Sequence, residues 1–238
     1  MKVKTKDLLR FLNIAGMTDE AEVKECVLQF LPKGIELATI TAQENVAVKG
    51  FYTVEMHGEN FGKVGLDNLP TLKKYLENFD AEEVNITKED NYLVLSAPKK
   101  KVKVQLRNIE YAPIVENEKI DKLISLGKKN LVTLPNTILS KLLGNSILLN
   151  TNEFNLTGKG KKLNYTAKSW AEDILEETLE AEGLDGVEVN LSKYFLNAIT
   201  NIKDDVQIGI NPKTPIYVGY EKDNVKVEFA IAPVMKEV

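Results

Sequence analysis

The same order of sequence patterns occurs twice along this chain, and this internal repeat constrains the fold more than any other feature. Residues 64–106 and residues 189–229 each begin with a Val-x-Leu segment and continue with the apolar spacing of an amphipathic helix. An alternating strand, a polar turn and two further strands follow in both copies. The string Val-Lys-Val closes the copies at Val102–Val104 and Val225–Val227. We therefore expect two similar folding units.

The front half of each unit has a looser version of one pattern. A short helix is predicted at residues 4–15 and again at residues 136–144, each followed by a hairpin and a third strand. The hairpins are predicted at Cys26–Leu37 and Ser146–Leu156. Because hairpins make antiparallel sheets, we expect an α+β fold with two helices covering one face of the sheets in each unit.

The predicted units are residues 1–108 and residues 130–238. The stretch between them, residues 109–129, carries Pro113, mixed charge and only weak periodicity. We expect this stretch to be an interdomain connector.

The chain lacks the residues on which most familiar enzyme sites depend. Its 238 residues include one cysteine, Cys26, and one histidine, His57, which cannot build a Cys/His zinc cluster or a redundant nucleophile and base pair. The string TGKGKK at Thr157–Lys162 lacks both the glycine spacing and the Ser or Thr of a phosphate-binding loop, and is typical of a basic turn. We expect no catalytic residue, no metal site and no cofactor.

The hydropathy pattern gives no sign of a membrane segment or a signal peptide. No stretch approaches the roughly 20 apolar residues that cross a bilayer, and Asp7 and Arg10 interrupt the apolar N-terminal run. We therefore expect a cytoplasmic protein, in the host cytoplasm if the source is viral, that is not secreted and has no membrane partner.

Charge is segregated along the chain although the net charge is only −4. The four segments that contain the predicted helices sum to +6, which leaves −10 on the remaining residues; the segments are residues 1–17, 66–78, 131–145 and 190–203. The third and fourth segments contain no acid. Their expected exposed faces suit a phosphate backbone, because cations and short polar groups bind phosphates without reading sequence; these faces carry Thr137, Ser140, Lys141, Lys193, Asn197 and Asn201.

Two further charged runs admit more than one interpretation. The acidic block Ala171–Asp185 is predicted as a solvated loop or short helix. The basic run Lys99–Lys103 falls in a hairpin, where its lysines serve either to bind nucleic acid or to protect a sheet edge from aggregation.

The order of elements, the tandem repeat and an Ala-Pro ending together resemble a known family. The most specific segments are VGLDNL at residues 64–69, VNIT at residues 84–87 and KTPIYVGYEKDNVKVEFAIAPV at residues 213–234. Over residues 1–235 the chain resembles the trimeric DNA sliding clamps, the class that contains proliferating cell nuclear antigen (PCNA), its archaeal relatives and the clamps of T-even-like phages.

The resemblance implies two tandem clamp-type domains per subunit and a homotrimer closed head to tail. The helices would line the hole and the antiparallel sheets would form the outer wall. Such a ring is a processivity factor without enzymatic activity, and its partners would be double-stranded DNA of any sequence, a DNA polymerase and a clamp loader. Three alternatives stay open: a clamp-like factor that acts in repair or transcription as a monomer or hetero-ring, a metal-dependent nuclease with paired carboxylates, and a scaffold without a DNA function.

The resemblance also implies three sets of site residues. Cations facing the hole would be Lys6, Arg10, Lys74, Lys141, Lys193 and Lys203. A pocket for partner peptides would be formed by Ile40, Val46, Ile114, Val115, Pro215, Ala232 and Pro233. Ala230 and Ile231 stand before the terminal Ala-Pro, where the cellular clamps often have an aromatic residue. The subunits would pair through edge strands at about Val102–Asn108 and Lys161–Lys168.

Overall fold

A computed structural model describes residues 1–18, 21–55, 61–111, 116–151, 153–169, 171–211 and 214–234. Within these residues the strands form one sheet of eight strands and two sheets of four, and all strand pairs are antiparallel. The central sheet contains, in spatial order, β5 (Gly62–Leu66), β2 (Cys26–Leu31), β3 (Gly34–Ile40), β4 (Val46–Thr53), β16 (Val225–Ile231), β15 (Ile216–Lys222), β14 (Val206–Gly209) and β9 (Leu131–Leu134).

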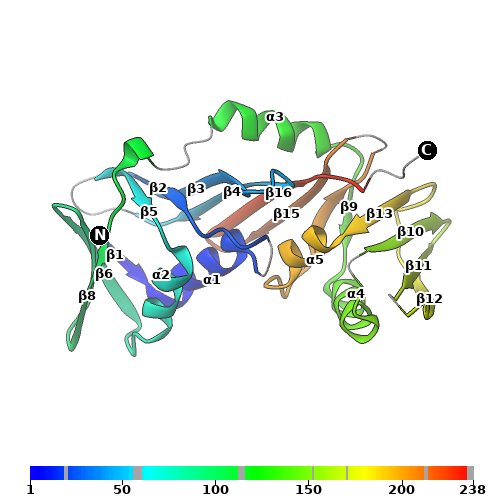
Figure 1. Ribbon diagram of the computed structural model, residues 1–238, viewed down its shortest axis with the longest axis horizontal. Helices are drawn as coiled ribbons and strands as arrows, with labels where there is room; N and C mark the ends of the chain where they lie inside the picture. Colours follow the sequence, from blue (N-terminus) through cyan, green and yellow to red (C-terminus); the bar gives the residue numbers. More distant parts are fainter. Residues whose placement is uncertain are drawn as a thin grey trace.

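The two small sheets stand at opposite ends of the molecule (Figure 1). The N-terminal sheet has the order β1 (Lys2–Lys4), β6 (Glu83–Glu89), β7 (Tyr92–Ala97) and β8 (Lys100–Gln105). The C-terminal sheet has the order β12 (Ile174–Glu180), β11 (Lys162–Lys168), β10 (Glu153–Lys159) and β13 (Glu188–Ser192).

Four helices lie on one side of the central sheet, between the two small sheets, and a fifth lies on the other side (Figure 1). The four are α1 (Thr5–Gly16), α2 (Leu69–Glu77), α4 (Asn136–Leu149) and α5 (Lys193–Ile199). We call their side of the molecule the helical face and the opposite side the outer face. The fifth helix, α3 (Asn117–Gly127), packs on the outer face against β3, β4, β15 and β16.

The structure confirms the internal repeat. The first half runs β1, α1, β2, β3, β4, β5, α2, β6, β7 and β8, and the second half runs β9, α4, β10, β11, β12, β13, α5, β14, β15 and β16. Each element of the first half thus has a counterpart in the second. The sequence missed β1 and β9, because each is a strand of three or four residues placed directly before a helix.

The two halves are joined by the pairing of β4 with β16 at the middle of the central sheet. Seven residue pairs form this joint, from Val225 opposite Tyr52 to Ile231 opposite Val46. Val48, Val227 and Phe229 are fully buried along it. Burial of each such side chain stabilises the fold by about 1.5–3 kcal/mol. The joint therefore merges both halves into one continuous hydrophobic core.

Local sequence explains how the helices are placed against this core. In α1 the buried residues Leu8, Phe11, Leu12 and Ala15 recur at helical spacing, so one stripe of the helix faces the sheet. In α2 the Asn68 side chain accepts a hydrogen bond of 2.9 Å from the Thr71 backbone amide, which caps the helix start.

Two predictions of secondary structure differ from the structure. The predicted hairpin Ser146–Leu156 is instead the last turn of α4 followed by β10, because the apolar run at residues 147–149 continues the helix until Asn150 adopts a left-handed conformation with φ 48°. The acidic block at residues 171–185 contains no helix, and only its two ends are loop, because the strand β12 occupies its middle. The side chains of β12 alternate between exposed and half-buried or buried, as in a strand, although most of the exposed ones are acidic.

The predicted edge strands are half right. Among the described residues β8 is paired on one side only, by β7, and forms an edge of its sheet as expected. The segment Lys161–Lys168 does not lie at an edge, because β11 pairs with both β10 and β12. The acidic strand β12 forms the edge instead.

The close approach of α1 to β4 requires a glycine at residue 50. A Cβ atom there would lie 2.7 Å from the Cε2 atom of Phe11, which is fully buried and cannot move aside. We expect Gly50→Ala to lower the free energy of unfolding by about 1–3 kcal/mol, measured by urea denaturation. Gly144→Ala is the control, because a Cβ at this helical position meets open space and should stabilise by about 0.5–1 kcal/mol. Equal effects of both changes would contradict the packing account.

Candidate nucleic-acid interface

The helical face carries exposed cations from three helical segments. Lys6 on α1, Lys74 on α2 and Lys203 after α5 are exposed, and none of them forms an ion pair with a described residue. We call these three residues the free lysines. On α2 the three leucines and Lys73 are buried, whereas Lys74 is exposed and points away from the core. Lys73 itself pairs with Glu22 at 3.5 Å and is 8% exposed, which removes it from the surface charge.

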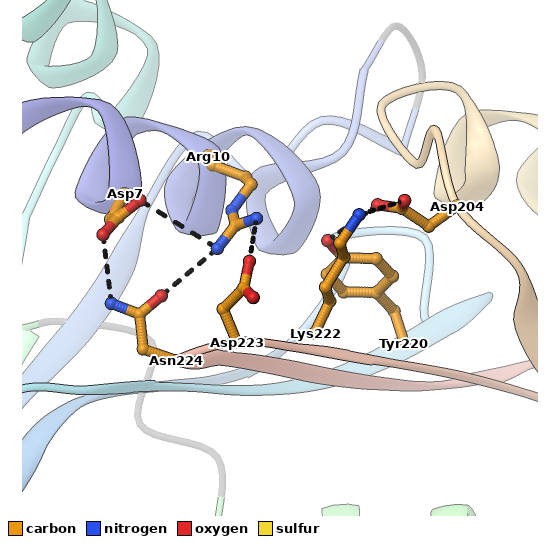
Figure 2. Close-up of polar contacts among 7 residues, drawn as sticks. All are labelled: Asp7, Arg10, Asp204, Tyr220, Lys222, Asp223 and Asn224. Atoms are coloured by element: carbon orange, nitrogen blue, oxygen red, sulfur yellow. Dashed lines mark hydrogen bonds and ion pairs between the residues drawn. The ribbon is translucent and has the colours of Figure 1, made fainter.

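Arg10 is engaged within the protein. Its Nη1 atom lies 3.0 Å from Oδ2 of Asp223, and its Nη2 atom donates to Oδ1 of Asn224 at 3.2 Å (Figure 2). The Asn224 side chain in turn donates to Asp7 on α1 at 3.2 Å. Asp223 and Asn224 form the turn between β15 and β16, where Asp223 has φ 53°. Arg10 therefore ties the first helix of one half to a hairpin of the other.

A second ionic contact lies beside this one (Figure 2). The Lys222 ammonium donates to Asp204 at 2.6 Å, and the Tyr220 hydroxyl donates to the same carboxylate at 3.3 Å. The hydrogen bond from Lys222 is the main reason that the pKa of Asp204 lies below its ordinary value. The contribution of this pair to stability is therefore present at neutral pH and lost as the pH falls through that lowered pKa.

The remaining two predicted cations are also in contact with the protein. Lys141 on α4 is exposed and pairs with Glu177 of β12 at 2.8 Å. This ion pair, followed by a hydrogen bond from Asn145, lowers the pKa of Glu177. Lys193 is half-buried with its ammonium 5.6 Å from the centre of the Tyr194 ring.

The expected polar stripe on the last helix is wrong. Asn197 is 8% exposed, because α5 has only seven residues and buries five of them in a row. Asn201 lies beyond the helix and donates a hydrogen bond of 2.8 Å to the backbone carbonyl of Asn13 on α1. The Asn201 amide therefore links the two halves of the molecule. Thr137 and Ser140 on α4 are exposed as expected.

Most of the predicted partner pocket converges at one end of the central sheet. Ile40 lies opposite Ala47, Val46 opposite Ile231, and Ile231 opposite Ile216, which follows Pro215. The Ala232 amide donates to the carbonyl of Asn45 at 2.8 Å. Ile40, Val46, Pro215 and Ala232 thus lie in neighbouring strands or directly beside them. Ile114 and Val115 lie outside the described residues.

The predicted pocket residues lie on different faces of the central sheet. Val46 is fully buried in the main core, whereas Ile40 packs in a small cluster on the outer face beneath α3. In this cluster Ile120 and Ile124 of α3 contact Ala47, Tyr217 and Ala230. Ion pairs fix the helix at each side, from Lys49 to Asp121 at 2.7 Å and from Lys128 to Glu228 at 2.6 Å. Helix α3 was not predicted from the sequence, because Ile120 and Ile124 are its only buried apolar side chains.

Pro233 lines a pocket of about 690 Å³ beside the C-terminal segment. The pocket lies between that segment, β9, the end of β14 and the loop before β13; its apolar lining includes Val132, Leu184, Val187 and Ile210.

No described group of His, Cys, Asp or Glu side chains could hold a metal ion. None of the described helices is long and apolar enough to cross a membrane.

The Arg10 contact should stabilise the joint between the halves. The Arg10 side chain is 30% exposed, so we expect Arg10→Gln and Asp223→Asn each to lower the free energy of unfolding by up to about 1 kcal/mol. The double variant should lose less than the sum, which a double-mutant cycle by urea denaturation measures. Lys161→Gln is the control, since its pair with Glu182 is 82% and 76% exposed and should contribute almost nothing. Strict additivity would argue against the contact.

Comparison with solved structures finds the same fold over the whole chain. PCNA from Entamoeba histolytica matches with a TM-score of 0.77 and 15% sequence identity, covering 98% of each chain. A structure described as the C-terminal region of FEN-1 bound to A. fulgidus PCNA matches with a TM-score of 0.75 and 15% identity, covering 100% of this chain and 98% of that one. No protein-family model and no curated protein sequence matches. The chain has the α+β fold of PCNA, with two tandem units of the same element order.

Proposed function

We propose that this protein is a sliding clamp: a homotrimeric ring that encircles duplex DNA of any sequence and tethers a DNA polymerase and other replication proteins. The observation that carries the proposal is the arrangement of four helices on one face of a tandem repeat whose two ends are open sheet edges. Similarity of fold to two PCNA structures along the full chain supports it. The units at residues 1–108 and 130–238 and the connector between them are the domains of the proposed subunit.

The proposed ring closes through the two open edges. β8 and β12 lie at opposite ends of the molecule (Figure 1), and each is paired on only one side among the described residues. An unpaired edge exposes backbone donors and acceptors that pair readily with another strand. Different edges at the two ends favour a head-to-tail contact, which closes into a ring when the rotation between copies permits.

The proposed DNA contacts come from the helical face. The free lysines reach into the hole from three different helical segments, and Lys141 and Lys193 add charge that is partly engaged within the protein. Arg10 serves mainly as the tie between the halves. A small number of exposed cations makes weak, salt-dependent contacts with phosphates. The ring would therefore stay on DNA because it encircles the duplex, not because it binds the duplex tightly.

The proposed partner surface lies at one end of the central sheet, where Ile40 faces α3 on the outer face and the pocket beside the C-terminal segment packs against the main core. A polymerase or clamp loader would insert a short peptide with apolar anchors, and the pocket lined by Pro233, Val132 and Ile210 offers apolar surface for one anchor. Ile40 and Pro215 lie on the two sides of Ala232 at the end of the sheet and extend this surface. Val46 is buried in the main core, which supports a role for its side chain in positioning the residues of this surface.

Solution mass tests the ring itself. We expect light scattering behind a sizing column to give about 80 kDa, three times the subunit mass of 26.7 kDa, at high protein concentration. A mass of one subunit at every concentration would reject the homotrimer and favour a clamp-like factor that acts alone or in a hetero-ring.

Charge reversal of the free lysines tests the DNA-facing surface. The triple variant Lys6→Glu, Lys74→Glu and Lys203→Glu should lose most of its binding to a short duplex at low salt, and the wild type should bind duplexes of any sequence with a steep salt dependence. The matched control reverses Lys119, Lys122 and Lys129, which are exposed on or directly after α3, and should bind like the wild type. Equal loss in both variants would contradict a DNA-binding helical face.

A further inference from the structure

Helix α3 is attached to the outer face by a small hydrophobic cluster that is separate from the main core (Figure 1). Ile120 and Ile124 are its only buried apolar side chains, and they contact Ala47, Tyr217 and Ala230 of the central sheet. Segments that bury few apolar groups open at a lower free energy than the fold as a whole. The helix can therefore leave the sheet without disturbing the core on the helical face.

The C-terminal end of α3 is held by backbone contacts. A Cβ atom on Gly127 would lie 2.6 Å from the carbonyl oxygen of Pro215, and a Cβ atom on Gly209 would lie 2.3 Å from the carbonyl oxygen of Gly127. Lys128, directly after the helix, pairs with Glu228 at 2.6 Å. This end is therefore fixed closely against β14, β15 and β16.

The N-terminal end of α3 is held only by side chains at the surface. Glu116 at the start of the helix provides no side-chain cap. The Asn117 side chain donates to Glu36 at 3.1 Å, and Lys49 pairs with Asp121 at 2.7 Å. Contacts between partly exposed groups contribute little to stability. Opening of the helix should therefore begin at this end.

We propose that α3 is a strap, hinged at Gly127, that detaches from its N-terminal end and uncovers a docking surface, where an amphipathic helix of a partner takes its place. This surface, the α3-binding surface, consists of Ala38, Ile40, Ala47, Tyr217 and Ala230. Ile40 is also a residue of the partner surface. The inference therefore rests on that part of the proposed function, and adds to it an internal competitor and the type of segment that binds.

The chemistry of α3 defines the helix that would replace it. Two aliphatic residues four positions apart, Ile120 and Ile124, face the sheet, and Asp121 beside the first of them pairs with Lys49. A partner helix would need the same three groups. With 11 residues, α3 is too short to stay helical in water once it has left the sheet. Its backbone amides then exchange with solvent, which makes the opening measurable.

Hydrogen exchange of the wild-type protein tests the strap. Amides of α3 should exchange through local opening, faster than those of β4 and β16, and the exchange should slow from Glu118 toward Gly127. Added salt should speed exchange in α3 but not in β4 and β16, because it screens the ion pairs. Exchange of α3 only together with β4 and β16 would overturn the proposal.

Removal of one ion pair sharpens this test. Asp121→Asn should raise the exchange of α3 amides about two- to fivefold and leave β4 and β16 unchanged. Lys122→Gln, at an exposed position of the same helical turn, is the control and should leave α3 unaltered. The same effect of both changes would argue against a strap held by the contact with Lys49.

A peptide of residues 116–128 tests the docking surface. In the full-length protein, Ile120→Asn and Ile124→Asn together should release α3 and leave the main core folded, which a urea unfolding curve checks. This double variant should bind the labelled peptide at about a tenfold lower concentration than the wild type does, because a tethered α3 competes at an effective concentration in the millimolar range. Fluorescence anisotropy measures both affinities.

The control peptide carries the same two asparagine substitutions and should not bind. Equal binding of the unchanged peptide to wild type and double variant, no binding to either, or binding of the control peptide would each overturn the docking surface. The hydrogen exchange measurement uses the wild type and does not depend on the folding of the double variant. Both tests use the chain alone, so their results are independent of the solution mass that tests the proposed ring.

Discussion

The pairing of β4 with β16 is the contact on which the rest of the architecture depends. It makes one sheet from strands of both halves and so fixes the rotation between them. With that rotation fixed, α1, α2, α4 and α5 fall on one face and α3 on the other (Figure 1). The Arg10 contact to the β15–β16 turn and the Asn201 contact to α1 hold the helices across the same joint. The open edges β8 and β12 are then left at the two ends.

The charges of the helical face serve two purposes that the sequence alone does not separate. Arg10 neutralises Asp223 and stabilises the joint between the halves, whereas Lys222 neutralises Asp204 within the second half. The free lysines remain exposed without such partners among the described residues. A face with few free cations and several paired acids would hold phosphates weakly at many positions. Weak contacts of this kind suit movement along DNA better than tight binding would.

The parts of the fold that depend on local residue patterns could be predicted from the sequence. Helical spacing at Leu69, Leu72 and Leu76, and the Val-Lys-Val strings that close both copies, were enough to identify the repeat. The predictions failed where distant contacts decide. The edge position of β12 depends on the order of strands in a sheet, and the burial of Asn197 depends on packing against the core.

The candidate site was predictable to a similar extent. Lys6, Lys74 and Lys203 were predicted from the resemblance to the sliding clamps, and the charge count over the helical segments agreed with that prediction only as a sum. The acids that engage Arg10 could not, because Asp223 lies 213 positions away in the sequence and meets it only through the β4–β16 joint. The helix α3 was missed because two isoleucines are too weak a signal in a charged connector.

Imaging of single particles by electron microscopy tests the central claim most directly. The account predicts closed rings of three subunits, with six similar domains around a hole that the helices line, in the absence of DNA and of other proteins. Open chains of variable length, or single elongated particles without a hole, would contradict it.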